Sequence, residues 1–132
     1  MVENRLIFSE DESNQIIEKF DFEKGNGLIP VIAQDYENNQ VLMQAYANKK
    51  AVKLTLTTGY VHYWSRSRNE LWKKGKTSGH LQLVKEIFLD CDADAILLKI
   101  DQIGAACHLN YRSCFFRKAK NNDFEIVLEK IE

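Results

Sequence analysis

The amino-acid sequence predicts an α+β fold, with a β-rich mixed sheet or pseudo-barrel as its core and one or two short helices. Three observations support this fold class. Segments that favour β-structure recur along the chain, one segment carries both a helix start and a helix stop signal, and there is a single proline. With 132 residues, 45% of them hydrophobic, the chain has the size of one domain, expected to span residues 1–132.

The first half of the chain is predicted to contain two helices and two strands. Residues 13–20 are expected to form a short helix capped by Ser13. Residues 28–36 (LIPVIAQDY) and 40–46 (QVLMQAY) indicate strands, joined by the turn-forming sequence ENN. The second helix is expected within residues 48–59, because asparagine caps its start and glycine supplies a left-handed stop.

Strands are predicted to dominate the second half. Residues 60–65 (YVHYWS) are rich in aromatic side chains, which favour β-structure. Residues 83–89 and 95–100 are expected to pair as strands on either side of the acidic bend DCDAD. Residues 112–117 and 124–128 are two further candidate strands.

Charge is distributed unevenly along the chain. The formal net charge is −1, which gives no reason to expect a nucleic-acid or membrane partner. Residues 60–80, however, contain five basic residues and one acidic residue, so this segment carries +4 and the remainder −5. A local basic segment on an acidic body suits a small anionic ligand.

Targeting signals are not apparent. The first 20 residues lack the apolar run of a signal peptide, and the longest uncharged run in the middle of the chain has 12 residues, too few to span a bilayer. We therefore expect a cytoplasmic protein. In a reducing compartment the three cysteines are expected to serve in packing, metal binding or catalysis rather than in disulfides.

The tripeptide GKT at residues 75–77 matches the end of a nucleotide-binding P-loop. The complete motif needs a glycine five residues before Gly75, where this chain has Glu70. A carboxylate at that position would face the phosphates, so the P-loop interpretation is excluded. The basic loop therefore needs another explanation.

The run DCDAD at residues 90–94 is a candidate metal site. In an extended backbone, Asp90, Asp92 and Asp94 would share one side and Cys91 would point to the other. Three close carboxylates repel one another, and Mg²⁺ would relieve that repulsion; a solvated acidic turn is an equally good interpretation of the run alone. An EF-hand is disfavoured, because its glycine and final glutamate are replaced by Ala95 and Asp101.

The cysteines indicate a second metal. Cys107 and Cys114 flank the stretch CHLNYRSC, which can loop both sulfurs toward one point, and Cys91 supplies a third thiol. Thiolates select Zn²⁺ whereas carboxylates select Mg²⁺, so two adjacent metals are chemically coherent. Three protein ligands and one open position are typical of a catalytic zinc, and His108 is either a fourth ligand or a proton-transfer group.

Three motifs together resemble the phosphoribosyl-AMP cyclohydrolase family of histidine biosynthesis, in its monofunctional form. They are WSRSRNELWKKGKTSGHLQ (64–82), DCDADAIL (90–97) and ACHLNYRSCF (106–115). The resemblance extends over residues 27–117. It implies a β-rich, intimately associated homodimer that binds Zn²⁺ and Mg²⁺.

Carried over residue by residue, the resemblance assigns zinc to Cys91 of one subunit with Cys107 and Cys114 of the other. It assigns magnesium to the three aspartates of the DCDAD run. The chain departs from the family pattern at Leu109 and Asn110, where threonine and glycine are usual. Because Asn tolerates a left-handed backbone, the turn is expected to survive.

The implied substrate is an adenine nucleotide carrying a second ribose phosphate on ring nitrogen 1. Water would attack ring carbon 6 and the bond to nitrogen 1 would break, with hydroxide supplied at the zinc and protons moved by His108 or, as a second candidate, His80. The basic segment would bind the two phosphates and the purine through Trp64, Ser65, Arg66, Arg68, Lys74, Thr77, Ser78 and Gly79.

Two other functions fit the sequence less well. A zinc-stabilised nucleotide-binding module without catalysis would have a closed four-ligand site. A nucleoside deaminase is disfavoured, because no histidine is followed two residues later by glutamate and Pro30 is not followed by cysteine. Some family members are fused to a pyrophosphohydrolase domain; with 15 residues after Arg117, that activity is expected on another chain.

Overall fold

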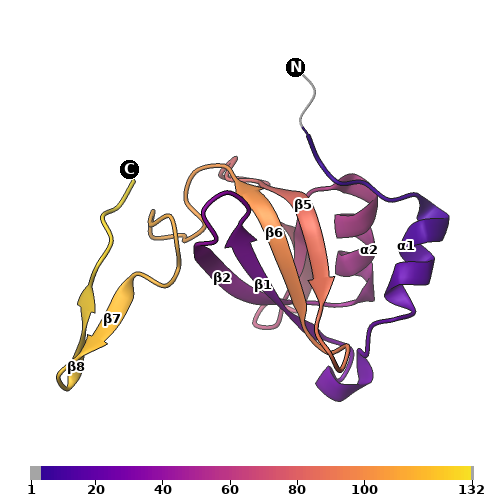
Figure 1. Cartoon of the computed structure of the whole chain (residues 1–132), viewed down its shortest axis with the longest axis horizontal. Helices are drawn as coiled ribbons and strands as arrows, with labels where there is room; N and C mark the ends of the chain where they lie inside the picture. Colours follow the sequence, from indigo (N-terminus) through magenta and orange to yellow (C-terminus); the bar gives the residue numbers. More distant parts are fainter. Residues whose placement is uncertain (1–3, 132) are drawn as a thin grey trace.

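Six strands form one curled sheet in the order β4-β3-β2-β1-β6-β5. Figure 1 labels β2, β1, β6 and β5 of this sheet. The computed structural model describes residues 4–131, so the ends of the predicted domain, residues 1–3 and 132, lie outside the described range. β1 pairs with β6 in parallel and every other pairing in this sheet is antiparallel, which confirms the predicted mixed sheet. The strands are β1 (Ile29–Asp35), β2 (Val41–Ala47), β3 (His62–Ser65), β4 (Glu70–Lys73), β5 (Gln82–Leu89) and β6 (Ile96–Gln102).

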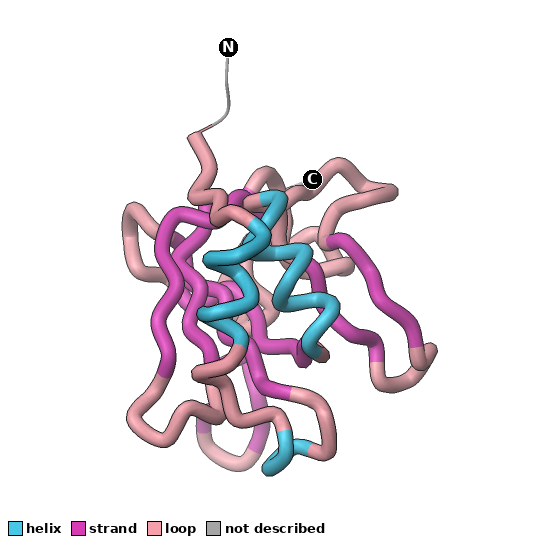
Figure 2. The backbone as a smooth tube through the Cα atoms, turned by 90° about the vertical axis from the view of Figure 1, so that its right-hand side faces the viewer, coloured by secondary structure: helices cyan, strands magenta, loops and turns pink. Residues whose placement is uncertain are grey.

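Two α-helices lie side by side against one side of the sheet (Figure 2). The helix α2 (Lys49–Thr58) has the predicted ends: the Asn48 side chain accepts a hydrogen bond from the Ala51 N–H, and Gly59 is left-handed with φ of 75°. The helix α1 (Glu10–Ile17) begins earlier than expected.

Ser9, not Ser13, caps α1, so that prediction was wrong. The Ser9 hydroxyl accepts from the Glu12 N–H, and the Glu12 carboxylate accepts from the Ser9 N–H, which together make a capping box. Two orphan backbone donors are satisfied in this way, whereas Ser13 is buried inside the helix. A short 3₁₀ turn, Glu23–Gly25, follows before β1.

The hydrophobic core lies between α2 and the inner face of the sheet. Alternate residues of β1 and β6 point inward and are buried, as a strand period of two requires. They pack against Val52 and Leu56 of α2 in one cluster. Within residues 4–131, no helix is long and apolar enough to cross a membrane.

The sheet curls into a half-barrel, in place of the predicted pseudo-barrel, and the segment before β3 reaches the edge strand β5. Tyr60, just before β3, bridges to Leu83 of β5, and the Val61 N–H donates to the Gln82 carbonyl over 3.1 Å. A buried polar chain lies inside this closure: the Tyr63 hydroxyl donates to Gln82 Oε1 over 2.6 Å, and Gln82 Nε2 donates to Gln102 Oε1 over 2.8 Å. Side chains of β3, β5 and β6 are thereby joined.

Several predicted strands shift at the carboxyl-terminal end. Residues 112–117 were predicted as a strand, but residues 112–116 form a loop because their side chains bond to the backbone of other elements, as Ser113 does to Val41, and Arg117 begins β7. The extra sheet is a hairpin of β7 (Arg117–Lys120) and β8 (Asp123–Ile126), which projects away from the rest of the molecule (Figure 1). Neither β4 nor β7 was predicted, because both are short and rich in charge.

The buried polar chain yields a stability prediction. Tyr63→Phe keeps the ring but leaves Gln82 Oε1 without its donor inside the core, so unfolding free energy should fall by about 1–3 kcal/mol. Urea denaturation at neutral pH measures this change. The matched control is Tyr36→Phe at an exposed tyrosine, expected within about 0.5 kcal/mol of wild type. Equal stability of Tyr63→Phe and wild type would contradict a structural role for the hydroxyl.

Candidate active site

The loop that follows β6, residues 103–116, brings two of the three cysteines together. Cys107 is buried, and its sulfur accepts the Leu109 N–H over 3.4 Å. Cys114 is held by β2, because its N–H donates over 2.7 Å to the carbonyl of Leu42, the extra residue of a β-bulge. Between them Asn110 is left-handed with φ of 70°, as predicted from its place in the motif.

The two thiols affect each other. Although Cys114 keeps some exposed surface, the protein around its sulfur removes water, and this raises its pKa to about 11. The neighbouring Cys107 thiol raises the pKa further, and the Lys74 ammonium opposes the shift. A pair of sulfurs beside one cation is a ready donor set for a soft metal ion, which would displace the thiol protons on binding.

Arg112 braces this loop, a role that the sequence did not reveal. Its guanidinium donates to the backbone carbonyls of Gln102 (2.8 Å) and Gly104 (3.0 Å) and to the Asp35 carboxylate at the end of β1 (2.7 Å). Burial alone would raise the pKa of Asp35, but Arg112 and the N–H groups of Glu37 and Asn38 outweigh burial and hold it below the usual value.

Lys74 joins the basic segment to the cysteine loop. Its ammonium donates to the Ala106 carbonyl over 2.6 Å, next to Cys107. Burial lowers the pKa of Lys74, while the two thiols oppose that shift. Lys74, predicted to bind substrate, lines the groove described below and also contacts the cysteine loop.

An open groove with a volume of about 1620 Å³ runs along β3, β4 and the turn that follows them. The lining includes the predicted proton-transfer residue His108 and seven of the predicted substrate-binding residues: Trp64, Ser65, Arg66, Arg68, Lys74, Thr77 and Ser78. Gly79 and His80 are not part of that lining. The His80 ring instead packs on Gly104, where an added Cβ would lie 2.6 Å from His80 Cδ2.

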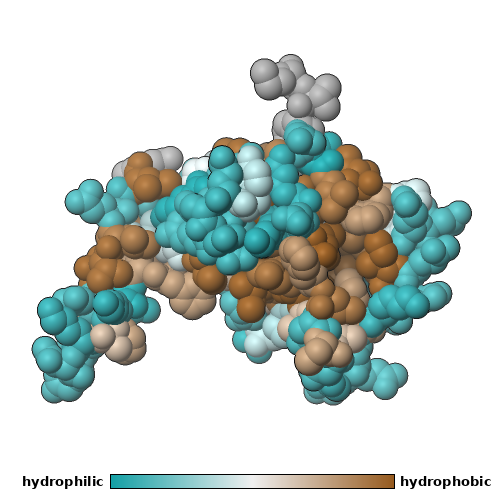
Figure 3. All heavy atoms as spheres, viewed as in Figure 1, coloured by the Kyte–Doolittle hydropathy of each residue, from teal (hydrophilic) through white to brown (hydrophobic). Residues whose placement is uncertain are grey.

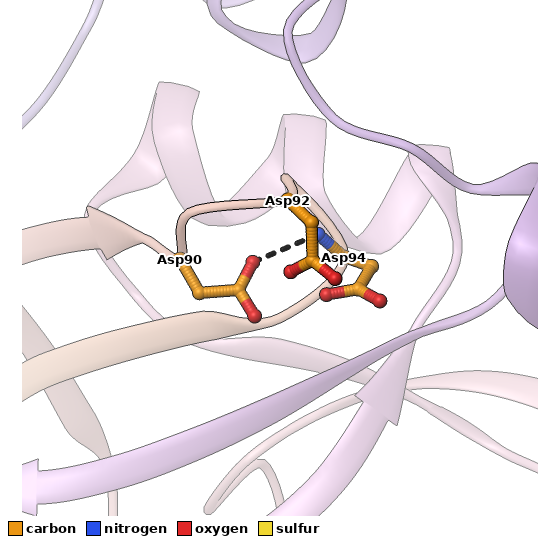
Figure 4. Close-up of side chains that lie close together, drawn as sticks. All are labelled: Asp90, Asp92 and Asp94. Atoms are coloured by element: carbon orange, nitrogen blue, oxygen red, sulfur yellow. Dashed lines mark hydrogen bonds between the residues drawn. The ribbon is translucent and has the colours of Figure 1, made fainter.

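The DCDAD run forms a tight turn between β5 and β6, not the extended segment considered in the sequence analysis (Figure 4). The Asp90 carboxylate accepts from the N–H groups of Asp94 and Ala95 over 2.9 and 3.1 Å, and Ala93 is left-handed. These bonds replace strand pairing and fold the run back on itself.

The turn still gathers the three aspartates. Each offers one oxygen within 4.8 Å of the others, which suits a hard cation. Because the carboxyl groups are close, their pKa values differ: a hydrogen bond between Asp92 and Asp94 raises the pKa of Asp94 and lowers that of Asp92. The Lys24 ammonium lies 3.4 Å from Asp92 and 3.5 Å from Asp94.

Cys91 lies far from the other two cysteines. It sits in the turn before β6, whereas Cys107 and Cys114 follow the opposite end of that strand. Seven residues at ~3.3 Å each separate the two ends by about 20 Å. Accordingly, among residues 4–131 only the aspartate triad brings three metal-binding side chains together.

Comparison with known proteins identifies the family of the chain. Residues 43–116, more than half of the chain, match the model of the phosphoribosyl-AMP cyclohydrolase family. The chain belongs to that family. Cyclohydrolases of this family are hydrolases of histidine biosynthesis, and membership favours this activity over a nucleoside deaminase or a non-catalytic zinc module.

Individual cyclohydrolases are similar over most of the chain. The phosphoribosyl-AMP cyclohydrolase of Methanospirillum hungatei is 65% identical over 76% of this chain and 74% of its own length. That of Desulforapulum autotrophicum is 56% identical over 85% and 90%. The histidine biosynthesis bifunctional protein of Thermoanaerobacter pseudethanolicus is 54% identical over 86% of this chain, and the match spans 51% of that longer protein.

The Arg112 brace predicts a pH-dependent stability. Since the folded-state pKa of Asp35 is depressed, its ion pair stabilises the protein above the unfolded-state pKa of about 3.9, and this contribution disappears as the pH falls through the lower folded-state value. Asp35→Asn should therefore lower unfolding free energy by about 2–4 kcal/mol at pH 7.

The measurement is urea denaturation of both proteins from pH 7 to pH 3. The difference between wild type and Asp35→Asn should shrink toward the acidic end. Asp11→Asn, at an exposed aspartate of α1, is the control and should follow wild type. A difference that stays constant from pH 7 to pH 3 would rule out the ionised Asp35 as its source.

Proposed function

We propose that this chain, as one domain in a homodimer, opens the six-membered ring of 1-(5-phosphoribosyl)-AMP with zinc as its cofactor. The bond between ring nitrogen 1 and carbon 6 is hydrolysed, giving the formimino-aminoimidazole carboxamide ribonucleotide, the third step of histidine synthesis. The observation that supports zinc most strongly is the thiol pair of Cys107 and Cys114 next to the groove. Family membership supports the reaction.

The zinc site is shared between two copies of the chain. Cys107 and Cys114 provide two thiolates, and Cys91 of the same chain lies beyond the opposite end of β6, a strand about 20 Å long. A Cys91 from a second copy completes a three-thiolate set with one open position, the arrangement of catalytic zinc sites. When bound, zinc supplies a Lewis acid that makes water a stronger nucleophile at neutral pH.

Magnesium fits the aspartate triad. Three carboxylate oxygens within 4.8 Å of one another match the hard-donor preference of Mg²⁺, which keeps water in its remaining positions. Because Cys91 lies within the same turn, the shared site brings both metals close to one another. The triad can then contact substrate phosphate through the ion.

The groove binds the nucleotide. Arg66 and Arg68 are exposed at its rim, where guanidinium groups can form paired hydrogen bonds to a phosphate, and the Thr77 and Ser78 hydroxyls offer further donors. Trp64 lines the same surface and offers a face for the purine. Arg66 already packs on the Tyr46 ring, 4.0 Å from its centroid, which restricts its position.

His108 is the residue placed to move protons. It is exposed in the groove directly after Cys107, so it lies next to the metal ligands and the substrate surface together. It removes a proton from the attacking water and returns one to nitrogen 1 as the bond to carbon 6 breaks. His80, packed on Gly104 outside the groove lining, remains the second candidate.

Mixing variants tests the shared zinc site. Cys91→Ser and Cys107→Ser should each abolish zinc binding and ring opening, since each removes a ligand from both sites of a dimer. After subunit exchange in an equal mixture, half of the dimers are mixed and each holds one intact site. Ring opening, followed by ultraviolet absorbance, should recover to about one quarter of wild type, with matching zinc content.

The control mixture combines Cys107→Ser with Cys114→Ser. Both changes fall on the same half of the site, so every dimer in this mixture lacks a ligand at both sites and no recovery is expected. Recovery in neither mixture would argue against sharing. Zinc content restored without ring opening would separate metal binding from catalysis.

Arg66 offers a test of the groove. Arg66→Glu should raise the KM for the nucleotide by about 10- to 100-fold, because one charge-assisted phosphate contact is lost and repulsion replaces it. Steady-state kinetics with zinc-loaded enzyme measures the change. Lys50→Glu, the same charge reversal on the exposed surface of α2, is the control and should leave KM unchanged. An Arg66 variant with wild-type KM would place the phosphates elsewhere.

A further inference from the structure

The β7–β8 hairpin presents an apolar surface to solvent. All eight of its strand residues are exposed, including Phe124 at 65% and Ile126 at 61%. Figure 1 shows it standing away from the six-stranded sheet. A two-stranded hairpin is marginally stable by itself, so its apolar side chains need a cover. The hairpin also lies outside the segment that matches the family model, residues 43–116.

The base of the hairpin is fastened to the cysteine loop. The rings of Tyr111 and Phe116 stack with centroids 3.8 Å apart. After β8 the chain returns to the loop, where the Val127 N–H donates to Phe116 and the Ile131 N–H to Asn110, each over 2.9 Å. The hairpin and the thiol pair are therefore parts of one anchored unit.

A second apolar surface lies on the outer face of the sheet. Phe88 of β5, Leu97 of β6 and Ile32 of β1 are direct neighbours across three strands. Phe88 is 45% and Ile32 38% exposed, because the helices cover the opposite face. Figure 3 shows hydrophobic side chains gathered over this part of the sheet. Strands that are apolar on both faces are typical of sheets buried on both faces.

Both elements begin or end close in sequence to a cysteine of the proposed shared site. Arg117, the first residue of β7, comes three residues after Cys114, and Phe88 comes three residues before Cys91. A pairing of two copies that brings Cys114 to the other copy's Cys91 therefore brings the start of β7 to within about 20 Å of the end of the other copy's β5. Charge agrees with this placement, since β7 reads RKAK and the turn after β5 reads DCDAD.

We propose that the β7–β8 hairpin is a docking arm for a second copy of this chain. Phe124 and Ile126 of one copy cover the row of Ile32, Leu97 and Phe88 of the other, and the basic strand β7 lies against its acidic turn. By two-fold symmetry each copy gives one arm and receives one. The inference rests on the proposed function only in that the shared zinc site sets the direction of approach.

Self-association of zinc-free protein tests the arm without the metal. Sedimentation equilibrium would compare a Cys91→Ser background with the same protein carrying Phe124→Ser and Ile126→Ser, and with one carrying Phe88→Ser. Both sets should weaken the dimer by at least about 100-fold, since each removes apolar surface that the interface buries. Ile7→Ser, at an exposed isoleucine before α1, should dissociate as the background does.

Two further measurements test whether the variants still fold and whether the hairpin contacts the outer face of the other copy's sheet. All substituted side chains are solvent-exposed in the single chain, so circular dichroism and thermal unfolding of the monomers should match the background. In a background with all three cysteines replaced by serine, Phe88→Cys and Ile126→Cys proteins should form a crosslinked heterodimer only after mixing. A monomeric background, unchanged dimerisation of the hairpin variant, or no crosslink would each overturn the arm.

The same measurements separate the arm from the enzyme mechanism. If the Cys91→Ser and Cys107→Ser mixture recovers ring opening while the hairpin variant still dimerises, the shared site stands and the arm is wrong. If the hairpin variant dissociates while neither zinc nor ring opening depends on the cysteines, the arm stands and the zinc mechanism is wrong.

Discussion

The contact between Arg112 and Asp35 is the interaction on which the rest of the site depends. The cysteine loop makes little regular structure of its own, so its position relies on side chains that reach the sheet. One guanidinium ties two loop carbonyls to a buried carboxylate at the end of β1, and Ser113 and Cys114 then bond to β2. The thiol pair, the groove wall at His108 and the base of the hairpin all follow from that anchoring.

The closure of the sheet explains why the basic segment lies beside the cysteines. Contacts between Tyr60 and Leu83 bring the outer parts of a six-stranded sheet together, and the Tyr63–Gln82–Gln102 chain satisfies the polar groups buried there. The same curvature of the sheet places the turn between β4 and β5 beside the cysteine loop. Lys74 can then reach the Ala106 carbonyl, a contact between residues 32 positions apart.

Local features were predictable from sequence, and long-range ones were not. The Asn48 cap, the Gly59 stop and the left-handed Asn110 each depend on a few neighbouring residues, and the structure has all three. The sequence also predicts that the three aspartates lie close together. It predicts an extended backbone, however, whereas the structure gathers them in a turn. The ion pair of Arg112 and Asp35 joins residues 77 positions apart, so sequence spacing does not predict it. The separation of Cys91 from the other thiols depends on β6 lying between them, and spacing in the sequence does not reveal that either.

Lys24 gives the aspartate triad a second property. Its ammonium, on the turn before β1, contacts Asp92 and Asp94, so the two carboxylates have a counter-ion that belongs to the chain. A divalent cation at the same oxygens would have to replace this ammonium, so its binding would be an exchange rather than a simple addition. Both partners are about half exposed, so salt screens the ammonium contact and shifts that exchange. The apparent affinity of the triad for a divalent cation would therefore also measure how firmly the residues before β1 are held.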